Sequence, residues 1–136
     1  MKYIPILFLG LGLIACNKDD DTDSTAPTVN IISPNEDDHF DHGDTIHFEA
    51  SASDNEALSQ MKVEIHFSED GHTHKVQNEW EESRTYDLNG MSQTIKDEFI
   101  VPLDADTGFH HFIVIALDEA GNSSRTEEVD FEIEEH

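Results

Sequence analysis

The sequence predicts an all-β protein, an antiparallel β-sandwich of about seven short strands. Several stretches alternate apolar and polar side chains, which is the period of a strand with one buried face. Polar segments containing Gly, Pro, Asn or Asp separate these stretches, as turns separate the strands of a sheet. No useful length of the chain carries the period of an amphipathic helix. Two sheets packed face to face are therefore the expected core.

The first residues are not expected to belong to this sandwich. A short positive start precedes an apolar run over residues 4–15, which is too short to cross a bilayer comfortably and is typical of a signal peptide. The run ends in Leu13-Ile14-Ala15-Cys16, which resembles a bacterial lipobox, and Cys16 is the only cysteine. We therefore expect a lipoprotein signal peptide over residues 1–15 and lipidation of Cys16. A plain secretory peptide with a chance cysteine is the alternative.

An acidic segment follows the expected lipid anchor. Residues 16–25 read as a lipidated acidic tether, and Asn17-Lys18-Asp19-Asp20-Asp21 resembles the surface-export signal of Bacteroidetes lipoproteins. This favours an outer-membrane lipoprotein exposed at the cell surface, with a periplasm-facing orientation as the alternative. The formal net charge of −24 repels nucleic acid and anionic membrane surfaces. Membrane contact is thus expected through the lipid anchor only, and no nucleic-acid partner is expected.

The first half of the sandwich is expected to contain three strands. Each alternates apolar and polar residues, and Pro27 before the first strand suits a sheet edge. The long connection between the first two strands is polar and acidic, so it reads as a loop. In order, these elements are a strand at 28–33, a loop at 34–44, a strand at 45–53 and a strand at 61–67.

The second half is less regular at its beginning. Residues 72–90 suggest only a short strand near 75–77 and a turn at Asn89-Gly90. A strand at 91–101 stops at Pro102, and the most apolar strand follows at 109–117. The turn Ala120-Gly121-Asn122 then leads into a last strand that buries Val129, Phe131 and Ile133.

Two sequence segments resemble bacterial immunoglobulin-like domains. They are APTVNIISP…GDTIHFEASASDN near the start and GFHHFIVIALDEAGNSS near the end, where Ala116, Asp118, Gly121 and Asn122 match an Ala-x-Asp-x-x-Gly-Asn pattern. The resemblance implies that residues 26–136 form an immunoglobulin-like sandwich, and it says little about function.

A narrower resemblance is to an uncharacterised family of Bacteroidetes immunoglobulin-like lipoproteins, a domain of unknown function. Its members carry a histidine-rich run after the third strand and a Tyr-His-Phe on the penultimate strand. The positions of this chain that fall on these two patterns are His66, Asp70, His72, Thr73, His74 and His111-Phe112. His110 stands where the family pattern has the tyrosine.

The histidine-rich run suggests a site for a divalent metal ion. In a sandwich of this topology the third and penultimate strands are neighbours, so His66 and His111 are expected side by side on the outer face. His72 and His74 point to the same side in an extended chain. Neutral imidazole is a preferred ligand of Zn²⁺, Cu²⁺ and Ni²⁺. The expected ligands are His66, His72, His74 and His111, with His39, His42 and Asp70 as possible additions; a solvated polar turn is the alternative.

A second cation site is conceivable near the opposite end. The loops after the second and penultimate strands carry oxygen ligands suited to Ca²⁺, although the same residues also serve in ordinary turns. The candidates are Asp54, Glu56, Asp118 and Asn122.

The function expected from these features is not enzymatic. The chain contains no Gly-x-Ser-x-Gly, no phosphate-binding loop and no His-Glu-x-x-His. The leading hypothesis is a lipid-anchored cell-envelope domain that binds Zn²⁺ or Cu²⁺ through its histidines for metal capture or uptake, with an outer-membrane transporter as a possible partner. The alternative is an adhesion or scaffolding module with at most a structural calcium ion.

Overall fold

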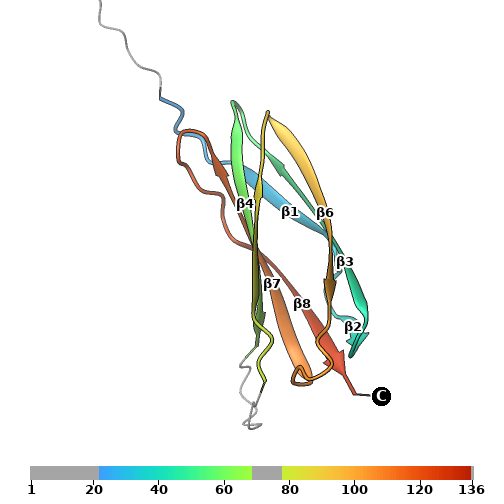
Figure 1. Ribbon diagram of the computed structural model, residues 1–136. Coiled ribbons are helices and arrows are strands. Elements are labelled where there is room, and N and C mark those ends of the chain that lie inside the picture. Colours follow the sequence, from blue (N-terminus) through green and yellow to red (C-terminus); the bar gives the residue numbers. More distant parts are fainter. Residues whose placement is uncertain (1–21, 69–77, 136) are drawn as a thin grey trace, which may run out of the picture.

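A computed structural model of the chain describes residues 22–68 and 78–135. Figure 1 shows two packed sheets, with the N-terminal segment and the C-terminus at opposite ends. The strands are β1 (Thr28–Ser33), β2 (Asp38–Asp41), β3 (Thr45–Ser53), β4 (Leu58–Phe67), β5 (Glu82–Asp87), β6 (Ser92–Ile100), β7 (Gly108–Asp118) and β8 (Glu127–Glu134). The predicted all-β sandwich is confirmed, with one strand more than expected. None of the described residues forms a helix that is long and apolar enough to cross a membrane.

The strands divide between a three-stranded sheet and a five-stranded sheet. Their orders are β1-β3-β6 and β2-β8-β7-β4-β5. Strand β2 pairs with β8 in parallel, so the chain changes sheets between β1 and β2. The loop predicted over residues 34–44 was therefore wrong for β2, because four residues are too short for an alternating pattern to be recognised.

The core lies between the sheets and is built around four phenylalanines. Phe48, Phe99, Phe112 and Phe131 are all buried. The ring of Phe112 lies 5.3 Å from that of Phe48 and 5.2 Å from that of Phe131, measured between centroids. Burying each such ring stabilises the fold by about 1.5–3 kcal/mol. The predicted burial of Phe131 and Ile133 on the last strand is confirmed.

Strand β5 is a second element that was not predicted from the sequence. The short strand expected near 75–77 lies outside the described residues. β5 instead occupies the edge of the larger sheet beside β4, and its half-buried side chains, Glu82, Arg84 and Tyr86, are polar. A strand whose inner positions are polar has no hydrophobic period, which explains why the pattern was not visible.

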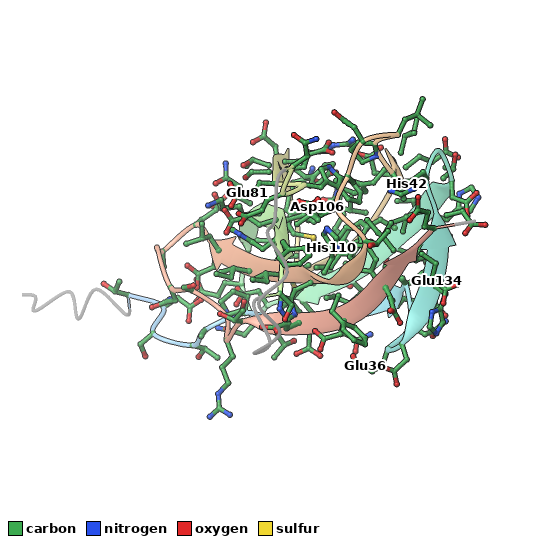
Figure 2. All side chains as sticks on the ribbon, turned by 90° about the horizontal axis from the view of Figure 1, so that it is seen from below. Glu36, His42, Glu81, Asp106, His110 and Glu134 are labelled. Carbon is green, nitrogen blue, oxygen red and sulfur yellow. The ribbon has the colours of Figure 1, made fainter. Side chains whose placement is uncertain are left out.

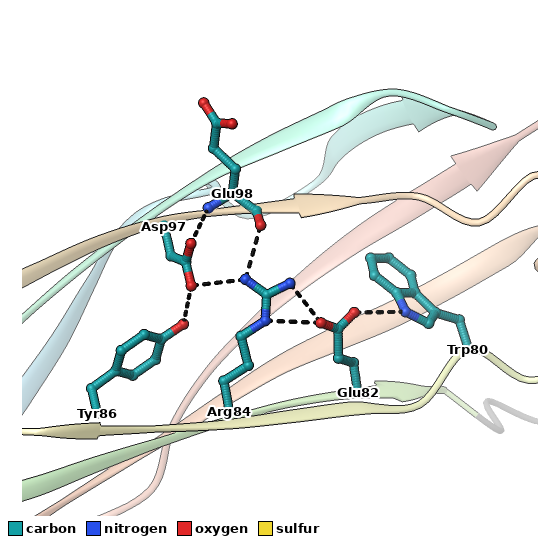
Figure 3. A network of polar contacts seen from close by, with 6 residues as sticks. All are labelled: Trp80, Glu82, Arg84, Tyr86, Asp97 and Glu98. Carbon is teal, nitrogen blue, oxygen red and sulfur yellow. Dashed lines mark hydrogen bonds and ion pairs between the residues drawn. The ribbon is translucent and has the colours of Figure 1, made fainter.

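The polar side chains of β5 make a network with β6 across the open edge of the sandwich (Figure 3). Nη1 of Arg84 donates to Oδ2 of Asp97 at 2.7 Å and to the carbonyl of Glu98 at 2.9 Å. Nε and Nη2 of Arg84 donate to Oε1 of Glu82, and the Tyr86 hydroxyl donates to Asp97. The network joins the edges of the two sheets.

Candidate metal site on the outer face of the five-stranded sheet

One row of side chains crosses three neighbouring strands near the lower end of the sandwich. His66 of β4 is the register partner of His111 of β7, and His111 is the register partner of Asp130 of β8. Directly opposed residues in antiparallel strands share a face and have Cβ atoms about 4.5–5.5 Å apart. The expected adjacency of His66 and His111 is therefore confirmed. Both side chains are half-buried.

Two carboxylates hold the imidazole of His111. Its Nδ1 lies 2.5 Å from Oδ1 of Asp130 and 3.0 Å from Oε1 of Glu128. An ionised carboxylate only accepts hydrogen bonds, so the proton belongs on Nδ1 and the lone pair on Nε2. In protein metal sites, a carboxylate commonly orients the ligating histidine in this way. The sequence analysis did not single out Glu128 or Asp130.

A second imidazole contacts the acidic strand from its other side. Nδ1 of His39 on β2 lies 2.9 Å from Glu134 and 3.5 Å from Glu132. Side-chain exposures of 52% for His39 and 44% for Glu134 allow water to compete, and such surface pairs contribute little to stability. β2 and β7 lie on opposite sides of β8, so the His39 and His111 clusters are separate.

Among the described residues, the other two predicted histidines, His39 and His42, do not join the His66–His111 pair. Figure 2 looks onto this end of the sandwich, with His110 near the middle and His42 and Glu134 nearer the rim. Nε2 of His42 bonds to the carbonyl of Ala105 at 2.8 Å, which gives this ring a structural role. Asp70, His72 and His74 lie outside the described residues.

His110 is fully buried beside the candidate site but faces the core. Its Nδ1 bonds to the Gly108 carbonyl at 3.1 Å, and its ring stacks on Phe131 at 5.5 Å. Burial lowers the pKa of His110, and the bond to Gly108 opposes this shift only in part. The side chain is therefore a neutral core residue.

The residues expected to bind calcium lie at the other end of β4 and β7. Asp54 and Asp118 come together there with Asp23, a residue that the sequence analysis assigned to the tether. Asn122 donates to both oxygens of Asp118. Glu56 contributes its backbone N–H to Asp54, while its carboxylate is not part of the three-residue group.

The two-sheet architecture places the chain among immunoglobulin- and fibronectin-like β-sandwich modules. The family model described as "Domain of unknown function (DUF4625)" matches residues 14–134, so the chain belongs to this family. A comparison with curated proteins gave no match.

Solved structures with the same fold share little sequence with this chain. The fibronectin(III)-like modules of Clostridium thermocellum CbhA are 21% identical, with a TM-score of 0.53 over 81% of this chain and 47% of that one. The sporulation control protein Spo0M of Bacillus subtilis is 13% identical, with a TM-score of 0.54 over 82% and 51%. The SrpA adhesin R347E mutant of Streptococcus sanguinis is 17% identical, with a TM-score of 0.51 over 85% and 61%. The chain thus spans less than two thirds of each of these proteins, and the likeness concerns the fold alone.

Proposed function

We propose that this protein is a non-catalytic module of the cell envelope that captures a divalent transition metal ion, Zn²⁺ or Cu²⁺, at His66 and His111. One observation carries the proposal: Asp130 and Glu128 fix the Nδ1 proton of His111, and the lone pair of Nε2 is left for a ligand. His66 is directly across the strand pair. Imidazole ligands from two adjacent strands suit both metal ions.

The described residues supply two histidine ligands, and a stable site needs more. Zn²⁺ usually takes four ligands, and a site that exchanges its metal leaves one or more to water or to a partner. Glu64 and Glu81 line a shallow depression beside His66, and a carboxylate from it can complete a coordination shell. His72 and His74 follow His66 closely in the sequence and remain predicted ligands. A partly open shell of this kind favours capture and transfer of the ion.

The placement of the site on the sandwich supports a role in delivery. The register pairs that contain Leu58 and His66 mark opposite ends of β4, about 26 Å apart at about 3.3 Å per residue. Asp23 lies at the Leu58 end, beside Asp54 and Asp118, where the N-terminal segment meets the sandwich (Figure 1). If Cys16 carries the expected lipid, the histidines face away from the membrane. An outer-membrane transporter is the partner that this arrangement would suit.

Calorimetric titration of the detergent-solubilised full chain with Zn²⁺, Cu²⁺ and Ni²⁺ tests the proposal. We expect sub-micromolar binding of at least one ion, and a loss of at least tenfold in affinity in His66→Ala/His111→Ala. A second double variant, His72→Ala/His74→Ala, tests the ligands predicted from the sequence alone. His47→Ala is the matched control, because His47 is 78% exposed and lies on the other sheet.

The result that would overturn the proposal is equal affinity in the parent chain and in His66→Ala/His111→Ala. Affinity should also fall between about pH 7.5 and pH 5, because ligating imidazoles must be neutral. Binding that stays constant over this range excludes histidine ligands.

A second candidate function is an adhesion or scaffolding module stabilised by calcium. The carboxylates gathered at the Leu58 end of the sandwich favour it. The two functions are compatible, because their cation sites lie at opposite ends and use different ligand atoms.

A further inference from the structure

Three carboxylates converge where the chain enters the sandwich. Asp23 precedes β1, Asp54 follows β3 and Asp118 ends β7. One oxygen of each lies within 4.8 Å of the others. No ion pair with a lysine or arginine reaches this group within residues 22–68 and 78–135. Three like charges are thus close together without a cationic side chain.

Backbone N–H groups around the cluster hold two of the carboxylates in this arrangement. Oδ2 of Asp54 accepts the N–H groups of Glu56 and Ala57 at 2.9 and 3.0 Å. Oδ1 of Asp23 accepts from the N–H of Thr25 at 2.9 Å.

The other side-chain oxygen of Asp23 and that of Asp54 indicate that the group binds a cation. Oδ2 of Asp23 and Oδ1 of Asp54 are inaccessible to water and have no hydrogen-bond partner among the described residues. Asp118 is only 3% exposed. Buried carboxylate oxygens without donors are rare in folded proteins unless a cation or a proton neutralises them. The burial of these two atoms is independent of the clustering itself.

The chemical type of the ligand atoms indicates which ion the group would bind. Every ligand atom available in the group is oxygen, and Asn122 lies beside it with an amide that donates to Asp118 Oδ2 at 2.7 Å and to the Asp23 carbonyl at 3.0 Å. Hard oxygen ligands in an irregular arrangement suit Ca²⁺, which takes six to eight of them and tolerates water in its shell. Zn²⁺ and Cu²⁺ prefer the nitrogen ligands at the other end.

We infer that Asp23, Asp54 and Asp118 form a calcium site that fastens the segment before β1 to the sandwich. One of its ligands lies in the loop after β3, one is the last residue of β7, and the third comes from the predicted tether itself. Calcium therefore joins two parts of the chain that are otherwise linked here by a few hydrogen bonds, such as that from Asn55 Nδ2 to Asp23. Binding would fix where the tether ends and how the domain is held relative to its anchor.

The inference is tested on the full chain in detergent, after removal of divalent ions with EDTA. Titration with Ca²⁺ should show one site per chain and raise the melting temperature. Asp23→Asn should weaken binding at least tenfold. Glu56→Gln is the matched control, because Glu56 is a neighbouring acid whose carboxylate lies outside the group, and it should bind calcium as the parent does.

Two further measurements separate a calcium site from a simple folding defect. Without calcium, Asp54→Asn should melt at the same temperature as the parent or higher, because it removes one of three like charges. Protease cleavage before Thr28 should slow in the parent when Ca²⁺ is added, and should not slow in Asp23→Asn. Equal calcium affinity in Asp23→Asn and Glu56→Gln, or no effect of Ca²⁺ on melting of the parent, would overturn the inference. His66→Ala/His111→Ala should leave all these results unchanged.

Discussion

Replacing Arg84 with methionine measures how strongly the network between β5 and β6 holds the two sheets together. Methionine retains an unbranched apolar chain that can still cover the ring of Phe99, over which the guanidinium now lies at 3.9 Å. The substitution removes the ion pairs to Glu82 and Asp97 and the hydrogen bond to the Glu98 carbonyl. It therefore tests the polar contacts with little loss of packing.

The expected cost follows from the exposure of these groups. Arg84, Glu82 and Asp97 side chains are 31%, 30% and 34% exposed, so water screens each ion pair to about 1 kcal/mol. Loss of the cation–π contact adds about 0.5–1 kcal/mol. The free energy of unfolding should therefore fall by about 2–3 kcal/mol, within the range typical of a broken polar network.

The measurement is unfolding in urea, monitored by the fluorescence of Trp80. This residue is buried at the start of this region. Lys96→Met is the control: it removes the pair with Glu49, but Lys96 is 72% exposed, so the cost should stay below about 0.5 kcal/mol. If Arg84→Met costs no more than Lys96→Met, the network is a solvated surface feature and the reasoning fails.

Three other predictions concern Asp97, Asp130 and His110. Burial acts to raise the pKa of Asp97, but hydrogen bonds from Tyr86 and Arg84 outweigh it and leave the pKa below its usual value. The stability that this carboxylate contributes is therefore present above about pH 3.9 and is lost as the pH falls through the lowered folded-state pKa. The difference in stability between the parent and Arg84→Met should accordingly shrink in acid unfolding curves. Asp130→Asn should lower Zn²⁺ affinity about 10–100-fold through the orientation of His111, as measured by calorimetry, and unchanged affinity would contradict the role given to this carboxylate. His110→Phe should raise the free energy of unfolding by about 1 kcal/mol, because Nε2 of His110 is buried and has no hydrogen-bond partner among the described residues. A clear loss of stability in urea unfolding would show that the imidazole is needed.

The strands predicted best from the sequence are those whose inner positions are mostly apolar. Strands β3 and β7 alternate without interruption, and this pattern is a local property of the chain. β5 escaped notice because the partners of its inner side chains lie on β6, in the other sheet. A contact between distant segments leaves no period in the sequence.

The residues of the candidate sites likewise divide into those that local sequence patterns predict and those that depend on contacts between distant segments. The pairing of His66 with His111 followed from the strand order of a sandwich together with strand alternation, and it is confirmed; that the pair binds metal stays a prediction. Which acid of β8 faces His111 depends on the register between β7 and β8, which the turn after Asp118 sets and the alternation does not. Asp23 sits in an acidic stretch without any pattern, so only the folded chain reveals its neighbours.

The high negative charge makes it necessary to separate specific sites from diffuse attraction. A chain with a net charge of −24 accumulates divalent ions around its whole surface, but charges on that surface are screened beyond about 8 Å at physiological ionic strength. Diffuse binding should therefore weaken steeply with salt and should hardly distinguish Ca²⁺ from Zn²⁺. The buried oxygens of Asp23 and Asp54 and the oriented imidazole of His111 are shielded from such screening. Opposite ion preferences at the two ends of the sandwich, retained in 0.15 M salt, would be the signature of two built sites, because uniform surface charge cannot produce them.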